Sequence, residues 1–342
     1  WPLAPHALHC SLRRCSLLRK TMPPKEEARY AFIVEWYDPS ASLVRQYQLI
    51  YYTADGTLEM YDLKNRRTFL KRCDYPGVGV KDLFKGGIIT VYSRQLTIVE
   101  YADSFTAGIF EKNAQTTTCC VKASAIPSMG RIIDAVNGSG FTISELALVK
   151  GELAISVTGD MASGSFEQLI QQMNAQLGAG SIGPAPPDVL SGAKPPIAQI
   201  ESSSLLLVRP HAVKAGMVGR MIDQVLGSGF KVMNMKMVQL TRPNAQEFLE
   251  VYRGVVPECV DWVEELASGK SVALQLVHEA KPEATVLAVR ELCGAHDPEI
   301  ANHLHPHSLR AQYGESKVKN AVHCTDLPED GPLEVDYFFQ LL

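Results

Sequence analysis

The sequence lacks three features that would each assign it to a broad class of protein. It has no apolar run long enough to span a membrane, so we predict no membrane partner. Its formal net charge is -4, without the basic excess of a general nucleic-acid-binding protein, so we predict no nucleic-acid partner. None of its eight cysteines forms a Cys-x-x-Cys motif, which favours reduced, cytosolic thiols over a zinc site.

What the sequence does contain is enough apolar material for several small domains. With 342 residues and 46% hydrophobic content, the chain can bury two or three modest cores. Residues 1–24 stand apart, because they include three arginines and no acidic residue. This pattern is typical of an organellar transit peptide, or of an over-extended reading frame whose true start is Met22, and we favour the second interpretation. Under both, residues 1–27 are predicted to be disordered.

The segment 28–112 is rich in predicted strands. Polar and apolar residues alternate on both sides of the turn at 54–56, Ala-Asp-Gly, which is a clear hairpin signal. A basic run at 64–72 is by default a solvated turn, although as a cluster it would attract an acidic partner. The segment therefore predicts a β-rich module of the barrel or PH-like kind. Its predicted strands are 32–37, 45–53, 57–62, 88–92 and 95–101.

One stretch of the sequence occurs twice. Residues 130–141, Gly-Arg-Ile-Ile-Asp-Ala-Val-Asn-Gly-Ser-Gly-Phe, recur at 219–230 as Gly-Arg-Met-Ile-Asp-Gln-Val-Leu-Gly-Ser-Gly-Phe. Each copy is predicted as a strand, an amphipathic helix that stops at glycine, and a second strand. The repeat predicts two related domains, a truncated one at 113–177 and a longer one at 201–342.

The first copy has lost the polar residues that chemistry would need. Between Gly151 and Pro196 there is no arginine and no Asn-x-x-His sequence. One amphipathic helix is predicted at Ser165–Leu177, and residues 178–200, rich in Gly, Ala and Pro, are predicted to be an irregular linker. We therefore expect the first copy to show only the opening part of the fold, and to pack or bind without catalysing.

The second copy ends in the most informative motif, Asn320-Ala-Val-His323-Cys-Thr-Asp326, with Glu334 eleven residues beyond the histidine. Neutral imidazole can attack a terminal phosphate, and a nearby carboxylate can hold its other nitrogen in the right tautomer. A lone histidine among polar residues is more often structural, so the interpretation of this motif depends on the residues upstream of it.

Four upstream residues supply what a triphosphate site would need. They are Arg209 at a predicted strand end, Tyr252 in a predicted helical stretch, Arg290 and Arg310. Arginine forks neutralise charge on the phosphates, while the histidine accepts the transferred group. With these residues the chain resembles the nucleoside diphosphate kinases over 201–339, a family whose signature is Asn-x-x-His-Gly-Ser-Asp.

The resemblance implies a role for each matching residue. His323 matches the phosphorylated histidine, Asn320 the site amide and Glu334 the supporting acid. The residues expected to bind nucleotide are Arg209, Tyr252, Arg290, Arg310 and Thr325. Asp326 is expected to reach a metal only indirectly, through Mg²⁺-bound phosphate. The implied activity is transfer of the γ-phosphate of ATP to nucleoside diphosphates through phospho-His323, with ping-pong kinetics and Mg²⁺ as cofactor.

Several positions depart from the family pattern and leave catalysis open. Arg209 stands where the family has lysine; arginine keeps the positive charge but presents it as a planar fork. His211 stands where the family has aspartate. Residues 255–259 contain no aromatic to clamp the base; Trp262, one turn further on, is the candidate substitute, although such a tryptophan is more often core. The other two replacements are His296 for a phosphate-contacting threonine and Cys324 for glycine.

The resemblance also implies a fold and a first functional hypothesis with two alternatives. The expected class is α+β: the β-rich module, then two ferredoxin-like α/β-sandwich repeats, the first incomplete, each an antiparallel sheet with helices on one face. The motifs at 35–39 and 66–70 resemble a ciliary doublet module, and the family has axonemal members. The first hypothesis is therefore a structural inner protein of ciliary or flagellar doublet microtubules, bound to tubulin and neighbouring axonemal proteins. The alternatives are an active kinase and a scaffold at centrosomes.

Overall fold

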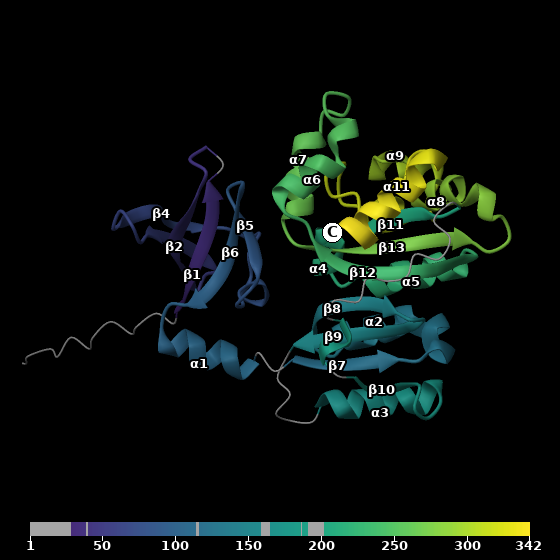
Figure 1. Ribbon diagram of the computed structural model, residues 1–342, viewed down its shortest axis with the longest axis horizontal. Coiled ribbons are helices and arrows are strands. Elements are labelled where there is room, and N and C mark those ends of the chain that lie inside the picture. Colours follow the sequence, from purple (N-terminus) through teal and green to yellow (C-terminus); the bar gives the residue numbers. More distant parts are fainter. Residues whose placement is uncertain (1–28, 39, 114–115, 159–164, 186, 191–201) are drawn as a thin grey trace, which may run out of the picture.

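The computed structural model describes residues 29–38, 40–113, 116–158, 165–185, 187–190 and 202–342. The predictions for residues 1–27 and 191–200 concern parts of the chain outside this description. The described chain forms two antiparallel sheets, of six and eight strands, which Figure 1 shows as an N-terminal module and a larger body. No helix among the described residues is long and apolar enough to cross a bilayer.

The N-terminal module is a half-barrel of six strands followed by one helix. Alternate strand residues face inward, as in β3, where Leu58 and Met60 are buried and Glu59 between them is not. Phe110 of the helix packs edge-on against Phe32 of the first strand, with ring centroids 5.2 Å apart, so the helix closes the core. The predicted β-rich module is thus confirmed. Its elements are β1 (Arg29–Asp38), β2 (Leu43–Tyr52), β3 (Thr57–Asp62), β4 (Arg67–Asp74), β5 (Ile88–Val91), β6 (Arg94–Tyr101) and α1 (Ser104–Asn113), with sheet order β4-β3-β2-β1-β6-β5.

Both repeats contribute four strands to the second sheet, whose order is β10-β7-β9-β8-β12-β13-β11-β14. The first repeat consists of β7 (Thr116–Val121), α2 (Met129–Gly138), β8 (Thr142–Val149), β9 (Glu152–Thr158), α3 (Ser165–Leu177) and β10 (Ile182–Ala185). The strands of the second are β11 (Ser204–Val208), β12 (Phe230–Gln239), β13 (Lys270–His278) and β14 (Val322–Cys324). Its helices are α4 (Pro210–Lys214), α5 (Val218–Gly227), α6 (Arg242–Phe248), α7 (Cys259–Ala267), α8 (Thr285–Cys293), α9 (Pro298–Leu304), α10 (Leu309–Tyr313) and α11 (Gly331–Asp336).

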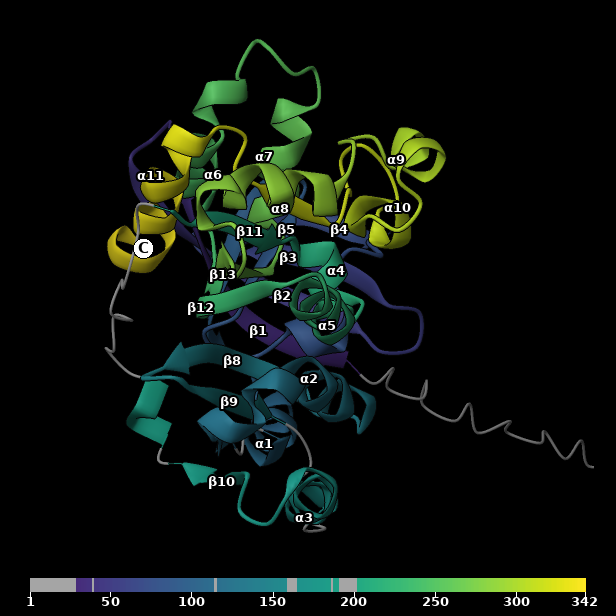
Figure 2. The same ribbon diagram turned by 90° about the vertical axis from the view of Figure 1, so that its right-hand side faces the viewer.

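The two repeats share one ferredoxin-like topology. In each, the first strand lies between the third and the fourth, and the second strand lies beyond the third. The second strands of the repeats, β8 and β12, are antiparallel neighbours, as Figure 2 shows. The repeats therefore join edge to edge in a single sheet, and each protects an edge strand of the other.

The prediction of an irregular linker at 178–200 is wrong over Ile182–Ala185, which forms β10 and pairs with β7. The first repeat therefore has all four strands, not only the opening part of the fold. It is incomplete in a different way. Lys150 and Gly151, with φ of 53° and 81°, join β8 to β9 in a tight hairpin, where the second repeat inserts α6 and α7.

Helices cover both faces of the second sheet, so the predicted one-sided arrangement is wrong. Helices α2, α5 and α8 share one core with the sheet, and α6, α7 and α11 share another on the opposite face. The central strand β11 explains this, because all five of its residues are buried. Leu206 and Val208 point into the first core, and Leu205 and Leu207 into the second.

Helices α2 and α5 meet at two glycines that the repeat relates to each other. A Cβ atom on Gly219 would lie 2.3 Å from the carbonyl oxygen of Gly130 and 2.2 Å from Oδ1 of Asp134. The reciprocal contact is equally close, since a Cβ atom on Gly130 would lie 2.4 Å from the carbonyl oxygen of Gly219. This close approach requires glycine on both helices.

We expect Gly219→Ala to destabilise the joined repeats by about 1–3 kcal/mol, because the added methyl group overlaps backbone atoms that cannot move independently. The matched control is Gly227→Ala at the end of the same helix, where a Cβ atom meets nothing within 4 Å. That change should be neutral or stabilise by up to about 1 kcal/mol, since alanine is the better helix former. Urea unfolding measures both, and equal effects would contradict the close contact.

The N-terminal module contacts the second repeat through β5 and β6. Gln95 uses both ends of its amide: Nε2 donates to the carbonyl of Leu240 over 2.9 Å, and Oε1 accepts from the N–H of Arg242 over 3.0 Å. Gln239 donates from Nε2 to the carbonyl of Ile88 over 3.0 Å. Because β5 is one edge of the six-stranded sheet, the opposite edge strand, β4, takes no part in these hydrogen bonds.

Candidate functional site

His323 occupies the middle of β14, at the end of the second sheet. Its Nε2 lies 3.3 Å from both carboxylate oxygens of Glu334 on α11. Thr325 fixes this carboxylate by donating from Oγ1 to Oε2 over 2.8 Å, and its own Oγ1 accepts from the N–H of Leu205. Phe248 packs edge-on against the imidazole, with centroids 4.8 Å apart. The ring is thus held with Nε2–H toward Glu334, which leaves the lone pair on Nδ1 for chemistry.

A cavity of about 610 Å³ opens beside His323 and brings together most of the predicted site residues. Thr325 and Glu334 do not line it and act through the histidine. Sequence reasoning did not assign His305, which joins the wall from the loop after α9. The predicted residues that line the cavity are Arg209, Tyr252, Arg290, Arg310, Asn320, His323 and Asp326, together with the noted replacements His296 and Cys324 and the candidate clamp Trp262.

Two arginines make the cavity cationic beside the histidine. Arg310 is half-buried and anchored by donating from Nη1 to the carbonyl of Gly294 over 2.7 Å. Arg290 is exposed and donates from Nη1 to the carbonyl of Asp326 over 2.9 Å. These bonds to backbone carbonyls fix the position of both guanidinium groups, as a phosphate-binding wall requires, and the Asp326 carboxylate lies 3.9 Å from Nε of Arg290 as its ion-pair partner.

Two buried polar atoms in the wall have no hydrogen-bond partner among the described residues. One is Oδ1 of Asn320, whose Nδ2 donates to the carbonyl of His296 over 3.1 Å. The other is Nε of Arg209, a side chain that is only 1% exposed. Buried polar groups are rarely left unpaired, so these atoms are suited to a ligand that accepts a bond from Arg209 and donates one to Asn320.

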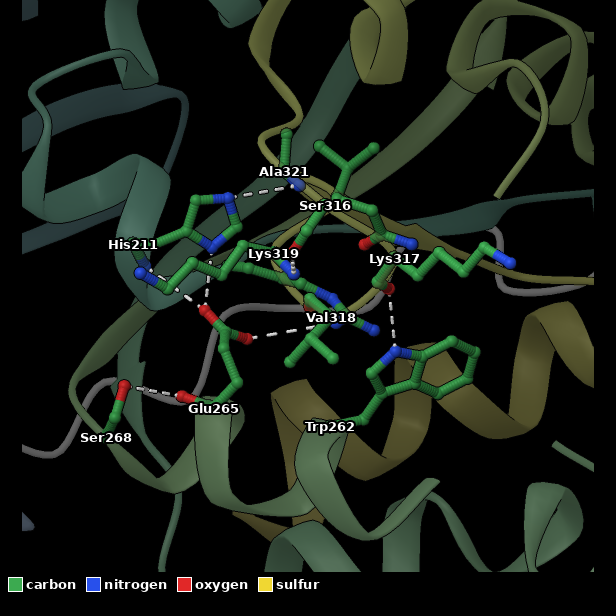
Figure 3. Close-up of polar contacts among 12 residues, drawn as sticks. His211, Trp262, Glu265, Ser268, Ser316, Lys317, Val318, Lys319 and Ala321 are labelled. Atoms are coloured by element: carbon green, nitrogen blue, oxygen red, sulfur yellow. Dashed lines mark hydrogen bonds and ion pairs between the residues drawn. The ribbon is translucent and has the colours of Figure 1, made fainter. Parts of the chain in front are cut away.

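A buried network behind the wall holds the loop that carries Asn320 (Figure 3). Glu265 accepts from Nδ1 of His211 over 2.8 Å and lies 3.9 Å from Nη1 of Arg209. Nε2 of His211 accepts from the N–H of Ala321 over 3.2 Å, so the imidazole is neutral with its proton on Nδ1. Arg209 completes the network by donating from Nη1 to the carbonyl of Val318 over 2.8 Å.

The network stabilises an unusual turn directly before the histidine. Ala321 has φ of 71°, a left-handed conformation that a non-glycine residue rarely adopts. Its N–H is bonded by His211, the residue that replaces the aspartate of the family pattern. Burial lowers the pKa of Arg209 to about 10, against the opposing effect of Glu265, so its guanidinium stays charged at neutral pH.

Known proteins match the chain in both of its parts. The family model for the nucleoside diphosphate kinase 7 N-terminal PH domain matches residues 24–112, and the model for nucleoside diphosphate kinase matches residues 202–341. Over an alignment of 391 positions, gaps included, the chain is 37% identical to nucleoside diphosphate kinase homolog 7 of Rattus norvegicus, covering 96% of this chain and 98% of the rat protein. The chain belongs to the nucleoside diphosphate kinase homolog 7 family.

Nucleoside diphosphate kinases of other organisms match a smaller share of the chain. The nucleoside diphosphate kinase of Aquifex aeolicus is 36% identical over 136 residues, which cover 40% of this chain and 92% of that protein. A crystal structure of the Aquifex aeolicus kinase shares 35% identity with a TM-score of 0.37, covering 40% of this chain and 94% of that one. Because the nucleoside diphosphate kinase model matches residues 202–341, the second repeat is the kinase-like part of this homolog 7 chain.

The aromatic residues of the wall are fixed in place in this member of the homolog 7 family. Trp262 donates from its indole nitrogen to the carbonyl of Lys317 over 2.9 Å and is 6% exposed. It lines the cavity but is almost fully buried, which agrees better with the alternative that this tryptophan belongs to the core than with a clamp on the base. Tyr252 donates to Oδ2 of Asp326 over 2.5 Å, and burial followed by this contact raises the pKa of its hydroxyl. The tyrosine is therefore neutral.

Among the described residues, no group of three or more His, Cys, Asp or Glu side chains is arranged so that it could hold a metal ion by itself. Asp326 and Glu291 are the carboxylates that line the cavity, and Asp326 is already bonded by Tyr252. These residues fit a Mg²⁺ ion that is held by phosphate oxygens and that Asp326 would reach only through the phosphate.

Proposed function

We propose that the second repeat binds a nucleoside triphosphate and accepts its terminal phosphoryl group on Nδ1 of His323. The observation that supports this most directly is the Glu334 contact to Nε2, which leaves the opposite nitrogen unpartnered among the described residues beside a cationic cavity. In the first step the Nδ1 lone pair forms a bond to the γ-phosphorus as the bond to the β–γ bridging oxygen breaks, and the nucleoside diphosphate leaves. In the second, a different nucleoside diphosphate takes the group from the histidine.

Each wall residue has a defined task in this proposal. Arg290 and Arg310 balance the charge that spreads over the transferred phosphoryl oxygens. Glu334 stabilises the positive charge that the ring gains when it is phosphorylated. Mg²⁺ bound to the phosphates would neutralise part of their charge. Oδ1 of Asn320 is suited to a sugar hydroxyl, because it is an acceptor without a donor in the described structure.

Labelling of the full chain with γ-labelled ATP tests this function. We expect label that survives base and is lost in acid, as for a phosphorus–nitrogen bond, and that moves to an added nucleoside diphosphate. Double-reciprocal plots should show the parallel lines of ping-pong kinetics. A chain that binds ATP but is never labelled would contradict the proposal.

We further propose that the rest of the chain serves a structural role in the ciliary or flagellar doublet microtubule, with tubulin and neighbouring axonemal proteins as partners. Two features support this. The first repeat keeps its fold while lacking the α6–α7 insertion and the histidine motif, and a fold kept without its chemistry is most simply kept for its surface. The second feature is the edge strand β4, whose exposed basic residues are Arg67, Lys71 and Arg72, with Lys64 and Arg66 just before it.

The basic edge is suited to a strongly acidic partner. Arg72 is paired with Asp55 over 2.7 Å and stacks on Tyr52, so it is fixed in position. Arg66 and Arg67 form no ion pair with another described residue. An edge strand also offers backbone groups to a partner, so charge and strand pairing can act together.

Extraction of isolated axonemes tests the structural role. We expect the full chain to stay with the doublets through detergent and high salt, as wide permanent interfaces do. The double variant Arg66→Glu, Arg67→Glu should be released at lower salt, because it reverses charge on the β4 edge. The double variant Lys231→Glu, Lys281→Glu, at exposed positions of the second repeat, changes the charge by the same amount and is the matched control. Recovery of most wild-type protein in the soluble fraction would contradict the proposal.

A further inference from the structure

Cys324 and Cys293 form a thiol pair in the wall of the phosphotransfer cavity. Cys324 follows His323 in β14, is 3% exposed and lines the cavity. Cys293 is the last residue of α8 and is fully buried. Both side chains lie in the same core, where the end of α8 packs against β14, and the Cys293 thiol is placed to donate a hydrogen bond to the Cys324 sulfur. Cys324 stands where the kinase family has glycine, and neither thiol has a part in the proposed phosphoryl transfer.

The surroundings of Cys324 differ from those of the other buried thiols. Nη2 of Arg310 lies 3.8 Å from its sulfur. The hydrogen bond from Cys293 lowers the pKa of Cys324, and the Arg310 guanidinium adds to this effect while burial opposes it. Burial raises the pKa of Cys293. A cationic neighbour and a path from solvent through the cavity are the conditions in which a cysteine becomes a reactive thiolate.

The adjacent pair Cys119-Cys120 provides the contrast within the same chain. Burial raises the pKa of Cys119 to about 12 and that of Cys120 to about 11. Cys120 hydrogen-bonds to the carboxylate of Glu152, which also opposes ionisation. Neighbouring residues in a strand point to opposite faces, so these two thiols are poorly placed to bond to each other. The two cysteines that are adjacent in sequence are therefore expected to be less reactive than Cys324.

We propose that Cys324 is a peroxide-reactive thiol and that Cys293 resolves it, so that oxidation by hydrogen peroxide closes a Cys293–Cys324 disulfide beside His323. In the first step the Cys324 thiolate attacks one peroxide oxygen; the O–O bond breaks, hydroxide leaves and a sulfenic acid forms. In the second, the Cys293 sulfur bonds to the Cys324 sulfur, its proton joins the departing hydroxide, and water leaves. Two thiols and one peroxide become one disulfide and two waters.

The disulfide would change the geometry of the site. It ties β14, which carries His323, to the end of α8, which carries Arg290 three residues earlier. It also removes the sulfur charge next to Arg310. A shift of about 1 Å at a reacting group can cost up to a hundredfold in rate, so we expect the oxidised protein to be phosphorylated at least about tenfold more slowly. This consequence rests on the proposed phosphotransfer, whereas the disulfide itself does not.

Mass spectrometry of the full chain tests the chemistry independently of activity. Reduced protein is treated with hydrogen peroxide, blocked with an alkylating agent and digested without reductant. We expect a Cys293–Cys324 cross-linked peptide that disappears with dithiothreitol, while Cys119 and Cys120 remain alkylated. With Cys293→Ser, dimedone should trap the sulfenic acid on Cys324, and the matched control Cys119→Ser should cross-link like the wild type. Cross-linking at Cys119-Cys120 instead, or no oxidation of Cys324, would overturn the proposal.

The labelling rate of the same samples separates the two proposals. If the cross-link forms and the reduced protein is labelled by ATP, oxidation should slow labelling and dithiothreitol should restore it. A cross-link in a chain that never takes label would overturn the phosphotransfer function and leave the thiol chemistry supported. A labelled chain without the cross-link would do the reverse.

Discussion

His323→Gln should abolish the phosphoenzyme formed from γ-labelled ATP. Glutamine keeps a polar side chain of similar reach, but its amide nitrogen has no lone pair available to attack phosphorus. Glu334 and Thr325 can still hold the substituted side chain, so binding of nucleotide to the cavity should change much less than labelling. The loss should reach the detection limit, because removal of a covalent nucleophile leaves no alternative route to the intermediate.

The control for this variant is His303→Gln, on the exposed surface of α9 outside the cavity. It should be labelled like the wild type. His296 and His305 also line the cavity, so each can be tested in the same way if label persists. Label that survives the loss of His323 would show that another group accepts the phosphate, and would contradict the assignment of the nucleophile.

The sequence was sufficient to identify the histidine and its nearest partners, because these residues are close together in the chain. His323, Asn320 and Glu334 lie within fifteen residues, on β14, the turn before it and α11, so their relative placement depends on a short piece of chain. The distant arginines could be placed only through the family resemblance, because nothing in the spacing of Arg209, Arg290 and Arg310 brings them together.

The support behind the site could not be predicted in this way. Glu265 contacts His211 across 54 residues of sequence, and His211 contacts Ala321 across 110. No periodicity encodes such pairs, since they arise where α4, α7 and the loop before β14 meet. A signal was present nevertheless: His211 replaces an expected aspartate, and a carboxylate elsewhere, Glu265, supplies the negative charge that this replacement removes.

The errors in the fold have equally particular causes. The segment with β10 was interpreted as linker because of its glycines and Pro184, yet the amide of Asn174 bonds both backbone groups of Ile182 and fixes the strand. Proline is tolerated there because β10 is an edge strand. The run of apolar residues at 205–208, without alternation, was itself the signal of burial on both faces, and it contradicted the one-sided prediction.

Glu265→Ala should cost the second repeat about 3–5 kcal/mol of unfolding free energy, the range for breaking a buried ion pair from one side. The carboxylate is 7% exposed and faces Arg209, which is 1% exposed and would keep its charge without an acidic partner. The same change removes the acceptor for Nδ1–H and the backbone N–H of His211. Each loss leaves a buried donor unsatisfied, which adds to the cost.

Glu264→Ala is the matched control, because Glu264 precedes Glu265 in α7 but pairs with Arg242 near the surface. Both side chains of that pair are partly exposed, so its loss should cost no more than about 1 kcal/mol. Thermal and urea unfolding of the two variants measure the difference. A small effect of Glu265→Ala would mean that Arg209 finds another partner. A large one should be accompanied by weaker nucleotide binding, because His211 would lose the contact that holds its imidazole against Ala321.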